Sequence, residues 1–332
     1  MFLWLGFIIC TAVIVYSGTR LAKYGDIIAE KTGMGRAWTG LILMASVTSL
    51  PELVTGISSV TYAGLPDIAV GDVLGSCVFN MLILAFLDAI YKPKPISAKA
   101  HHGHILSAGF GILLLSIIGI GLFLGSRVAP IGWIGLYSLM VPVIYFVAMR
   151  LLFVYERKRI AEFVKERVEE LRYEKVSTRT AVINYGINAL VVIIAAVFLP
   201  NIGERIAETT GLGQTFVGNI FIALSTSLPE VVVSISAVKM GAIDLAVGNL
   251  FGSNIFNIFI LALDDMFFVK GPILSFVNAS HIISALSAIL MTAIAIIGLT
   301  YRAEKKRLFL AWDSIGIVMM YIMNLMLLYA MR

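Results

Sequence analysis

Two copies of one five-residue sequence constrain this chain more than any other feature. Residues Thr48 to Glu52 read TSLPE, and Thr226 to Glu230 repeat the same letters. Each copy lies in an apolar run that is long enough to cross a bilayer. Proline interrupts the hydrogen-bond ladder of a helix, and a carboxylate at membrane depth marks a functional site. We therefore expect one site that two interrupted helices build together.

Composition predicts an all-α polytopic membrane protein. Hydrophobic residues make up 59% of the 332 residues, charged residues make up 14%, and the mean hydropathy is +0.95. Ten transmembrane helices are predicted, and most exceed the roughly 20 residues that a bilayer requires. They lie at about 2–19, 36–62, 67–90, 103–124, 130–154, 180–199, 213–238, 243–267, 280–300 and 309–330. No basic residue precedes Arg20, which favours a retained first helix over a cleaved signal peptide.

The lysines and arginines predict the orientation in the membrane. With the N-terminus outside, 21 of the 25 fall in loops on the inner side. The outer side keeps only Arg127, Arg205, Lys270 and Arg332. Because basic residues concentrate in cytoplasmic loops, we expect both termini outside and the central loop inside. That loop, residues 155–179, combines charges with apolar residues at helical spacing and is interpreted as an amphipathic connector.

The two halves of the chain are internal repeats. Residues Gly33–Glu52 and Gly211–Glu230 share ten identities in twenty positions, and Gly71–Asn80 matches Gly248–Asn257. Each half holds five predicted spans, so the second half must enter the membrane from the opposite side. This predicts two inverted five-helix repeats, 1–154 and 180–332, joined by 155–179. Inverted repeats recur in secondary transporters, where the binding site lies between the halves.

The polar groups of the repeats are oxygen donors. Each copy offers hydroxyls, a carboxylate and backbone carbonyls near the proline, and serine and asparagine lie four residues apart on one face of the following span. The candidate ligands are Ala45, Thr48, Ser49, Glu52, Ser76 and Asn80, with Ala223, Thr226, Ser227, Glu230, Ser253 and Asn257. Oxygen donors suit hard cations, and two carboxylates suit a divalent ion. For Gly40, Gly71, Gly75, Gly218, Gly248 and Gly252 we expect a role in close helix packing, and hydrogen bonding to the backbone or between helices is the structural alternative for the hydroxyl positions.

Other polar residues are interpreted as lying outside the site. Asp72 matches Asn249 in the second repeat and is interpreted as a solvated or capping residue, with an ion entrance as the alternative. Asp88, Asp264 and Asp265 lie at predicted span ends, where carboxylates are expected to reach water. The cluster of His101, His102 and His104 is interpreted as interfacial, with pH sensing as the alternative.

The paired TSLPE sequences, each followed by G-[DN]-x-x-G-S-x-x-x-N, resemble the alpha-repeats of the cation/calcium antiporter superfamily, and above all the prokaryotic sodium/calcium exchangers. The resemblance implies Ca²⁺ binding by Glu52 and Glu230 with the carbonyls of Thr48 and Thr226. It implies two mirrored Na⁺ sites, and asparagines flanking the centre. One Na⁺ site would use Ala45, Thr48, Ser49, Glu52 and Ser253; the other would use Ala223, Thr226, Ser227, Glu230 and Ser76. Alternating access is attributed in this family to the first and sixth spans sliding over the rest.

Two features of the sequence bear on the transported ions. Asn257 stands where some exchangers carry an aspartate, and it can neither carry charge nor accept a proton. The G-N-x-x-E signature of the proton-coupled branch is absent. We expect a Na⁺/Ca²⁺ antiporter, with Ca²⁺/H⁺ exchange on the same glutamates, or another divalent substrate, as the alternative.

The remaining expectations concern the class of protein and its surroundings. An intramembrane protease is disfavoured because Gly71-Asp72 lacks a partner aspartate motif, and a passive channel is the other rival. We expect no enzyme activity, no cofactor and no nucleic-acid partner. The expected partners are membrane lipid and small inorganic cations, in a prokaryotic plasma membrane.

Overall fold

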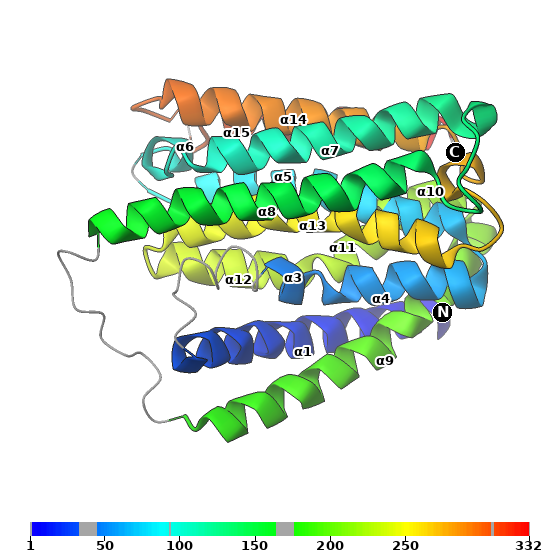
Figure 1. The fold of residues 1–332 in the computed structure, drawn as a ribbon, viewed down its shortest axis with the longest axis horizontal. Helices are drawn as coiled ribbons and strands as arrows, with labels where there is room; N and C mark the ends of the chain where they lie inside the picture. Colours follow the sequence, from blue (N-terminus) through cyan, green and yellow to red (C-terminus); the bar gives the residue numbers. More distant parts are fainter. Residues whose placement is uncertain (1, 33–44, 93, 164–175, 307–308, 332) are drawn as a thin grey trace.

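The computed structural model describes residues 2–331 except 33–44, 93, 164–175 and 307–308 (Figure 1). Regular structure in these residues is helical, apart from an isolated β-bridge between Ile131 and Ile134. Eight helices in this part of the chain are long and apolar enough to cross a membrane. They are α1 (Phe2–Thr32), α5 (Pro66–Ile90), α7 (His104–Leu124), α8 (Leu136–Phe163), α9 (Thr178–Thr210), α13 (Ile243–Phe267), α14 (His281–Tyr301) and α15 (Trp312–Ala330).

Two further predicted spans are built from short helices. The seventh consists of α10 (Gln214–Val217), a π-helical turn at Gly218–Ile222, α11 (Ala223–Thr226) and α12 (Leu228–Lys239), and it bends by 45°. The second predicted span begins in residues outside the described part. Its remainder consists of α3 (Ala45–Thr48), α4 (Leu50–Ser58) and a π-helical turn at Ser59–Ala63.

Both TSLPE sequences interrupt their helices at the same residue. Ser49 separates α3 from α4 with φ −88° and ψ 15°, and Ser227 separates α11 from α12 with φ −89° and ψ 4°. The proline lies in the first turn of the second helix in each case. A missing N–H has no cost there, because the first amides of a helix have no partner within it. The predicted interruptions are therefore confirmed.

Several helices run further than the predicted spans. Helix α1 continues to Thr32, because Leu21 and Ile27 are fully buried and keep the chain packed beyond the predicted end at residue 19. Helix α9 continues through Pro200 to Thr210, and Ile206 is buried in its last part. Helix α8 extends to Phe163, so the beginning of the expected connector is helical. The rest of that connector lies largely outside the described residues.

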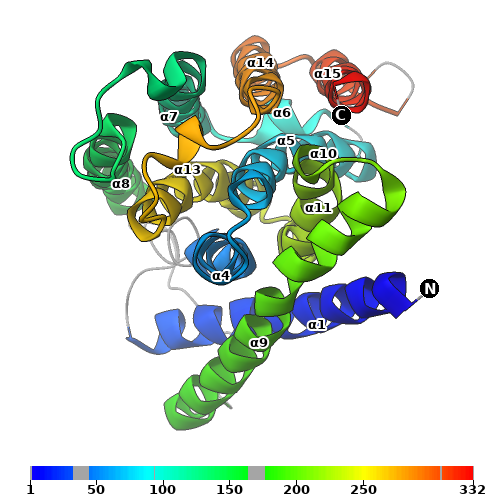
Figure 2. The same ribbon diagram turned by 90° about the vertical axis from the view of Figure 1, so that its right-hand side faces the viewer.

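The interrupted helices lie in the middle of the bundle. Helices α1 and α9 pack together on one side, and α7, α14 and α15 lie on the other (Figure 2). Between these layers, α5 and α13 run in opposite directions and pack against α4 and α12 (Figure 1). Helix α1 begins and α15 ends at the same end of the bundle, which we call the terminal end; α6 (Ile96–Lys99) lies at the opposite end (Figure 1).

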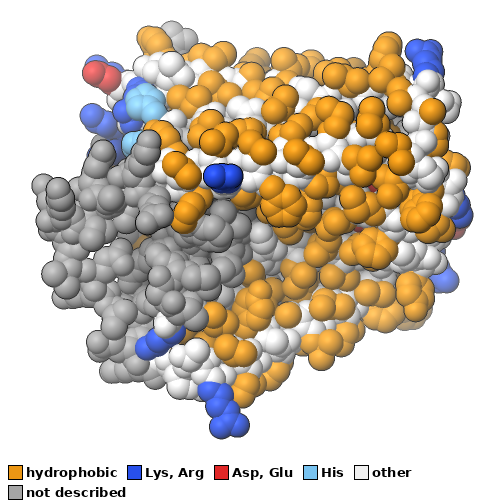
Figure 3. Space-filling model, viewed as in Figure 1, with side chains coloured by type: hydrophobic (Ala, Val, Ile, Leu, Met, Phe, Trp, Pro, Cys, Tyr) orange, Lys and Arg blue, Asp and Glu red, His pale blue; other side chains and the backbone are white. Residues whose placement is uncertain are grey.

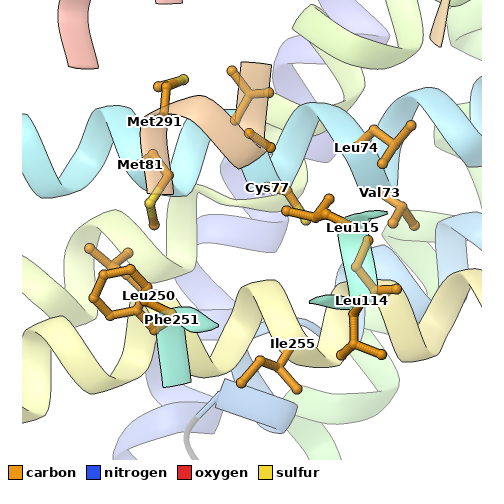
Figure 4. Packing of buried hydrophobic residues seen from close by; sticks show 14 of the residues in the cluster. Val73, Leu74, Cys77, Met81, Leu114, Leu115, Leu250, Phe251, Ile255 and Met291 are labelled. Atoms are coloured by element: carbon orange, nitrogen blue, oxygen red, sulfur yellow. The ribbon is translucent and has the colours of Figure 1, made fainter. Parts of the chain in front are cut away.

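A large apolar cluster holds the central helices in place. Figure 4 shows side chains of α5, α7, α13 and α14 in contact, among them Leu74, Leu115, Phe251 and Met291. Each of these four side chains is at most 1% exposed. Outside the bundle, apolar side chains cover the middle of the visible face, and most of its lysines and arginines lie toward the two ends (Figure 3). This distribution suits a lipid-facing surface.

Candidate ion-binding site

Glu52 and Glu230 lie just after the two helix interruptions and are both fully buried. Oε1 of Glu52 accepts hydrogen bonds from Ser227 Oγ at 2.8 Å and from Ser76 Oγ at 3.3 Å. Oε1 of Glu230 accepts them from Ser49 Oγ at 3.1 Å and from Ser253 Oγ at 3.4 Å. Each glutamate therefore receives one hydroxyl from its own half of the chain and one from the other half. We call these two glutamates and four serines the glutamate centre.

The second carboxylate oxygen of each glutamate has no hydrogen-bond partner. Oε2 of Glu52 and Oε2 of Glu230 are buried, and no polar group that the structure describes reaches them. The two carboxyl groups are close enough for their charges to interact. Two ionised carboxylates in this position repel each other, and a cation between them would remove both the repulsion and the cost of burial. The arrangement can therefore hold a divalent cation, or monovalent cations together with the serine hydroxyls.

The asparagines expected beside the centre are also buried. Asn80 Nδ2 donates to Asn254 Oδ1 at 2.9 Å, and Asn254 Nδ2 donates to the Cys77 carbonyl at 3.3 Å. Neither polar atom of the Asn257 amide has a hydrogen-bond partner among the described residues. The structure thus adds Asn254 to the polar residues beside the centre. Asn254 is equivalent to Cys77 in the repeat and was not predicted from the sequence.

The threonines of the two copies are both fully buried. Thr226 Oγ1 donates to Asp72 Oδ1 at 2.8 Å. Ala45 and Ala223 are the first residues of α3 and α11. The Ala223 carbonyl accepts hydrogen bonds from the Ser227 N–H at 3.1 Å and from the Thr226 hydroxyl at 3.3 Å, so both of its lone pairs have a partner.

Close helix contacts bring the two halves together at this point. The backbone of Asn219, in the π-helical turn before α11, lies so near Gly75 of α5 that any side chain at Gly75 would collide with it. Gly71 and Gly218 approach each other in the same way one turn along α5. The packing interpretation of Gly71, Gly75 and Gly218 is confirmed at these positions.

The expectation that Asp88, Asp264 and Asp265 reach water is wrong, because all three are fully buried. Asp88 accepts the backbone N–H groups of Ile96 at 2.7 Å and Ala311 at 2.8 Å, and pairs with Lys306 at 3.2 Å. Asp265 accepts the N–H of Ile273 at 2.6 Å, again eight residues later. These two carboxylates fix the loops that follow their helices.

Asp264 and Asp72 are also buried, and Asp72 contacts the TSLPE threonine rather than water. The solvated interpretation of Asp72 is therefore wrong. Its hydrogen bond to Thr226 connects α5 to the second helix interruption.

Two histidines contact aspartates of the other half. His104 Nε2 lies 3.0 Å from Asp244 Oδ1, and His281 Nε2 lies 3.0 Å from Asp67 Oδ1. His102 is exposed, whereas His104 is 4% exposed, so the expectation that the whole cluster lies at the surface is wrong for His104. The two histidines are 177 residues apart in the sequence, as are the two aspartates, so the repeat offset alone could have marked them as equivalent positions.

The fold defines an integral multi-pass membrane protein whose core contains two buried carboxylates from different halves of the chain. The chain belongs to the sodium/calcium exchanger protein family, whose sequence pattern matches residues 2–155 and 181–330. The family consists of transporters. The relationship confirms the resemblance noted in the sequence.

Three similar proteins illustrate the relationship. The sodium/calcium exchanger MaX1 of Methanosarcina acetivorans is 27% identical over 347 residues, which cover 95% of each chain. The structure of the sodium-calcium exchanger NCX_Mj has a TM-score of 0.62 and 20% identity, and 97% of each chain is covered. The structure of the H⁺/Ca²⁺ exchanger CAX has a TM-score of 0.72 and 11% identity, over 99% of this chain and 85% of that one. Both structures share this fold, but the names of the two proteins give different counter-ions, sodium for NCX_Mj and H⁺ for CAX.

Proposed function

We propose that this protein is a secondary antiporter that exchanges Na⁺ for Ca²⁺ by alternating access. The observation that carries the proposal is the glutamate centre, in which two fully buried carboxylates from different halves each keep one oxygen without a partner. A permanently empty pair of such carboxylates is costly in a membrane interior. Cations that arrive and leave in turn account for their position.

The glutamate centre accounts for exchange through competition. Ca²⁺ needs both carboxylates, together with carbonyl oxygens at Thr48 and Thr226. Na⁺ needs one carboxylate with neutral oxygens, which the two mirrored sets supply. The first set is Ala45, Thr48, Ser49, Glu52 and Ser253, and the second is Ala223, Thr226, Ser227, Glu230 and Ser76. Because the same carboxylates serve both ions, binding of Na⁺ displaces Ca²⁺, and release of Na⁺ on the other side allows Ca²⁺ to bind again.

The proposed architecture is two inverted five-helix repeats, 1–154 and 180–332, with both termini outside a prokaryotic plasma membrane and residues 155–179 inside. Equivalent helices support it: α5 and α13 each have 25 residues, and α7 and α14 each have 21. The two His–Asp pairs lie at equivalent positions of the two halves. The separate layer of α1 and α9 suits the two helices that would slide to expose the centre (Figure 2).

Ca²⁺/H⁺ exchange on the same two glutamates is the second candidate. The likeness to the H⁺/Ca²⁺ exchanger fold and the presence of Asn257 in place of an acid favour it. Against it stand the four serine hydroxyls bonded to the carboxylates, which proton carriage does not require.

Uptake of ⁴⁵Ca²⁺ into proteoliposomes distinguishes the two candidates. Vesicles loaded with Na⁺, with K⁺ or with a low-pH buffer are diluted into the same Ca²⁺ solution. The proposal predicts uptake only from Na⁺-loaded vesicles. Uptake driven only by the proton gradient would establish the second candidate, and uptake without any gradient would indicate a channel.

A further inference from the structure

Asp264 of α13 is a buried acid that the glutamate centre does not use. Among the carboxyl groups that the structure describes, it is the one with both oxygens buried and without a hydrogen-bond partner. Its side chain is 0% exposed. An isolated ionised carboxylate in an apolar interior costs several kcal/mol, so it requires a cation or a proton.

A second acid and an unpaired hydroxyl lie in the same region. Asp72 of α5 and Asp264 of α13 lie on helices that pack against each other. Asp72 Oδ1 accepts a hydrogen bond from Thr226 at 2.8 Å, while its Oδ2 is buried without a partner. The hydroxyl of Thr55 is likewise buried and unpartnered. Helices α4, α5 and α13 pack against one another here, and each contributes one of these oxygen-bearing side chains.

These side chains lie between the glutamate centre and the terminal end of the bundle. On α5, Asp72 comes four residues before Ser76, about 6 Å along the helix, and on α4, Gly56 comes four residues after Glu52. The end of α5 that is nearer Asp72 and the end of α4 that is nearer Gly56 both lie toward the terminal end of the bundle (Figure 1). Helix α13 also runs toward the terminal end, so Asp264 lies nearer that end than Asn257 does. The acids therefore form a second layer, displaced from the centre toward one end.

The other half of the molecule has no such acids at the equivalent positions. Asn249 replaces Asp72, Leu87 replaces Asp264 and Val233 replaces Thr55. Asn249 Nδ2 donates to Ser234 Oγ at 3.3 Å, which forms a neutral pair.

Gly56 makes room for Asp264. The repeat places Ser234 at the position equivalent to Gly56. A Cβ atom added at Gly56 would collide with both carboxylate oxygens of Asp264. The absence of a side chain at Gly56 therefore allows an acid at position 264. Together with Asp72 and Thr55, these two residues make the region acidic, whereas the equivalent region of the other half is neutral.

We propose that Asp72 and Asp264, with the Thr55 hydroxyl, form a second cation site that holds Ca²⁺ between the glutamate centre and the membrane face at the terminal end. Two carboxylates and a hydroxyl are ligands for a hard divalent cation. The site lies only on that side, so it gives the two membrane faces different affinities for Ca²⁺. The inference rests on the proposed function, because it takes Ca²⁺ as the cation that the centre exchanges.

Equilibrium binding of ⁴⁵Ca²⁺ to the purified full-length protein in Na⁺-free detergent buffer tests the second site. The wild-type chain is expected to bind two Ca²⁺, and Glu52→Gln/Glu230→Gln is expected to keep one. Adding Asp264→Leu to that double variant should weaken the remaining binding at least about tenfold. Asp264→Asn, which preserves the shape of the side chain, should have the same effect. Gly56→Ser/Asp264→Leu gives both positions the residues that the other half carries there, Ser234 and Leu87.

Two results would overturn the second site: the double glutamine variant binds no Ca²⁺, or its remaining binding is unchanged by both Asp264→Leu and Asp264→Asn. Failure of the proposed function gives a different result, in which the double glutamine variant still binds as many Ca²⁺ as the wild type. Thermal unfolding without Ca²⁺ serves as the folding control. Asp264→Leu should unfold no earlier than the wild type, because it removes an unpaired buried charge.

Discussion

Ser49 of the first TSLPE copy donates a hydrogen bond to Glu230 of the second copy over 3.1 Å. The reciprocal bond runs from Ser227 to Glu52 at 2.8 Å. Each helix interruption thus supplies a hydroxyl to the carboxylate that follows the other interruption. The two halves can separate at this point only if both bonds break or rearrange, which links the ion-binding groups to any movement between the halves.

Removal of either reciprocal hydroxyl should weaken Ca²⁺ transport. A hydrogen bond to a charged group contributes about 1.5–3 kcal/mol, so Ser49→Ala and Ser227→Ala should each raise the KM for Ca²⁺ about tenfold. Initial rates of ⁴⁵Ca²⁺ uptake measure this change. Ser236→Ala is the matched control, because Ser236 is exposed on α12 and bonds only to the carbonyl of Val232. A KM within twofold of the control for both variants would contradict the assigned role.

Ser76 and Ser253 should affect Na⁺ more than Ca²⁺. Each donates to the glutamate of its own half over a longer distance, 3.3 Å and 3.4 Å, and each belongs to one proposed Na⁺ set. Ser76→Ala and Ser253→Ala should therefore shift the Na⁺ dependence of uptake to higher Na⁺ while binding of Ca²⁺ changes less. Equal losses for both ions in these variants would argue against separate Na⁺ sites.

Asp88 should contribute to stability rather than to transport. It is fully buried, accepts two backbone N–H groups and pairs with Lys306. Breaking a buried ion pair costs about 3–5 kcal/mol, so Asp88→Asn should lower the unfolding temperature of the detergent-solubilised protein markedly. Glu304→Gln, at an exposed position nearby, should leave it unchanged. An unfolding temperature of Asp88→Asn equal to that of Glu304→Gln would show that the pair does not stabilise the loops.

The orientation of the repeats can be measured by labelling. Lys270 and Lys305 are both exposed, and the proposed topology places Lys270 outside and Lys305 inside. In a background of Cys10→Ala and Cys77→Ala, a membrane-impermeant maleimide added to intact cells should label Lys270→Cys and not Lys305→Cys. Labelling of Lys305→Cys should appear only after the cells are opened. The reverse pattern would invert the topology, and labelling of both in intact cells would contradict it.

Much of the central site could be predicted from the sequence, because a repeated proline and glutamate in apolar runs have few other uses. The interruptions at Ser49 and Ser227 and the burial of Glu52 and Glu230 follow from those residues. What the sequence does not contain is which serine reaches which glutamate. That depends on the packing of α5 and α13 between the two interrupted helices.

The acids near span ends could not be assigned from position alone. Asp88 and Asp265 look like residues at a membrane surface, yet the loops that follow fold back and cover them with backbone N–H groups. Asp264 is covered because Gly56 lets α4 approach α13 closely. Long-range contacts of this kind leave no local pattern in the sequence. The repeat offset did give some information, because it shows that Asp72 is equivalent to Asn249 and that His104 is equivalent to His281.

The role of the two glutamates is tested most directly by Na⁺-driven ⁴⁵Ca²⁺ uptake by Glu52→Gln and Glu230→Gln in proteoliposomes. Each substitution removes one of the two buried charges and keeps the shape of the side chain. Glu208→Gln is the matched control, because Glu208 is exposed near the end of α9. Both glutamine variants should insert and unfold like the control but lose uptake to the level of empty vesicles. Full uptake by either variant would contradict the claim that the two glutamates form the exchange site.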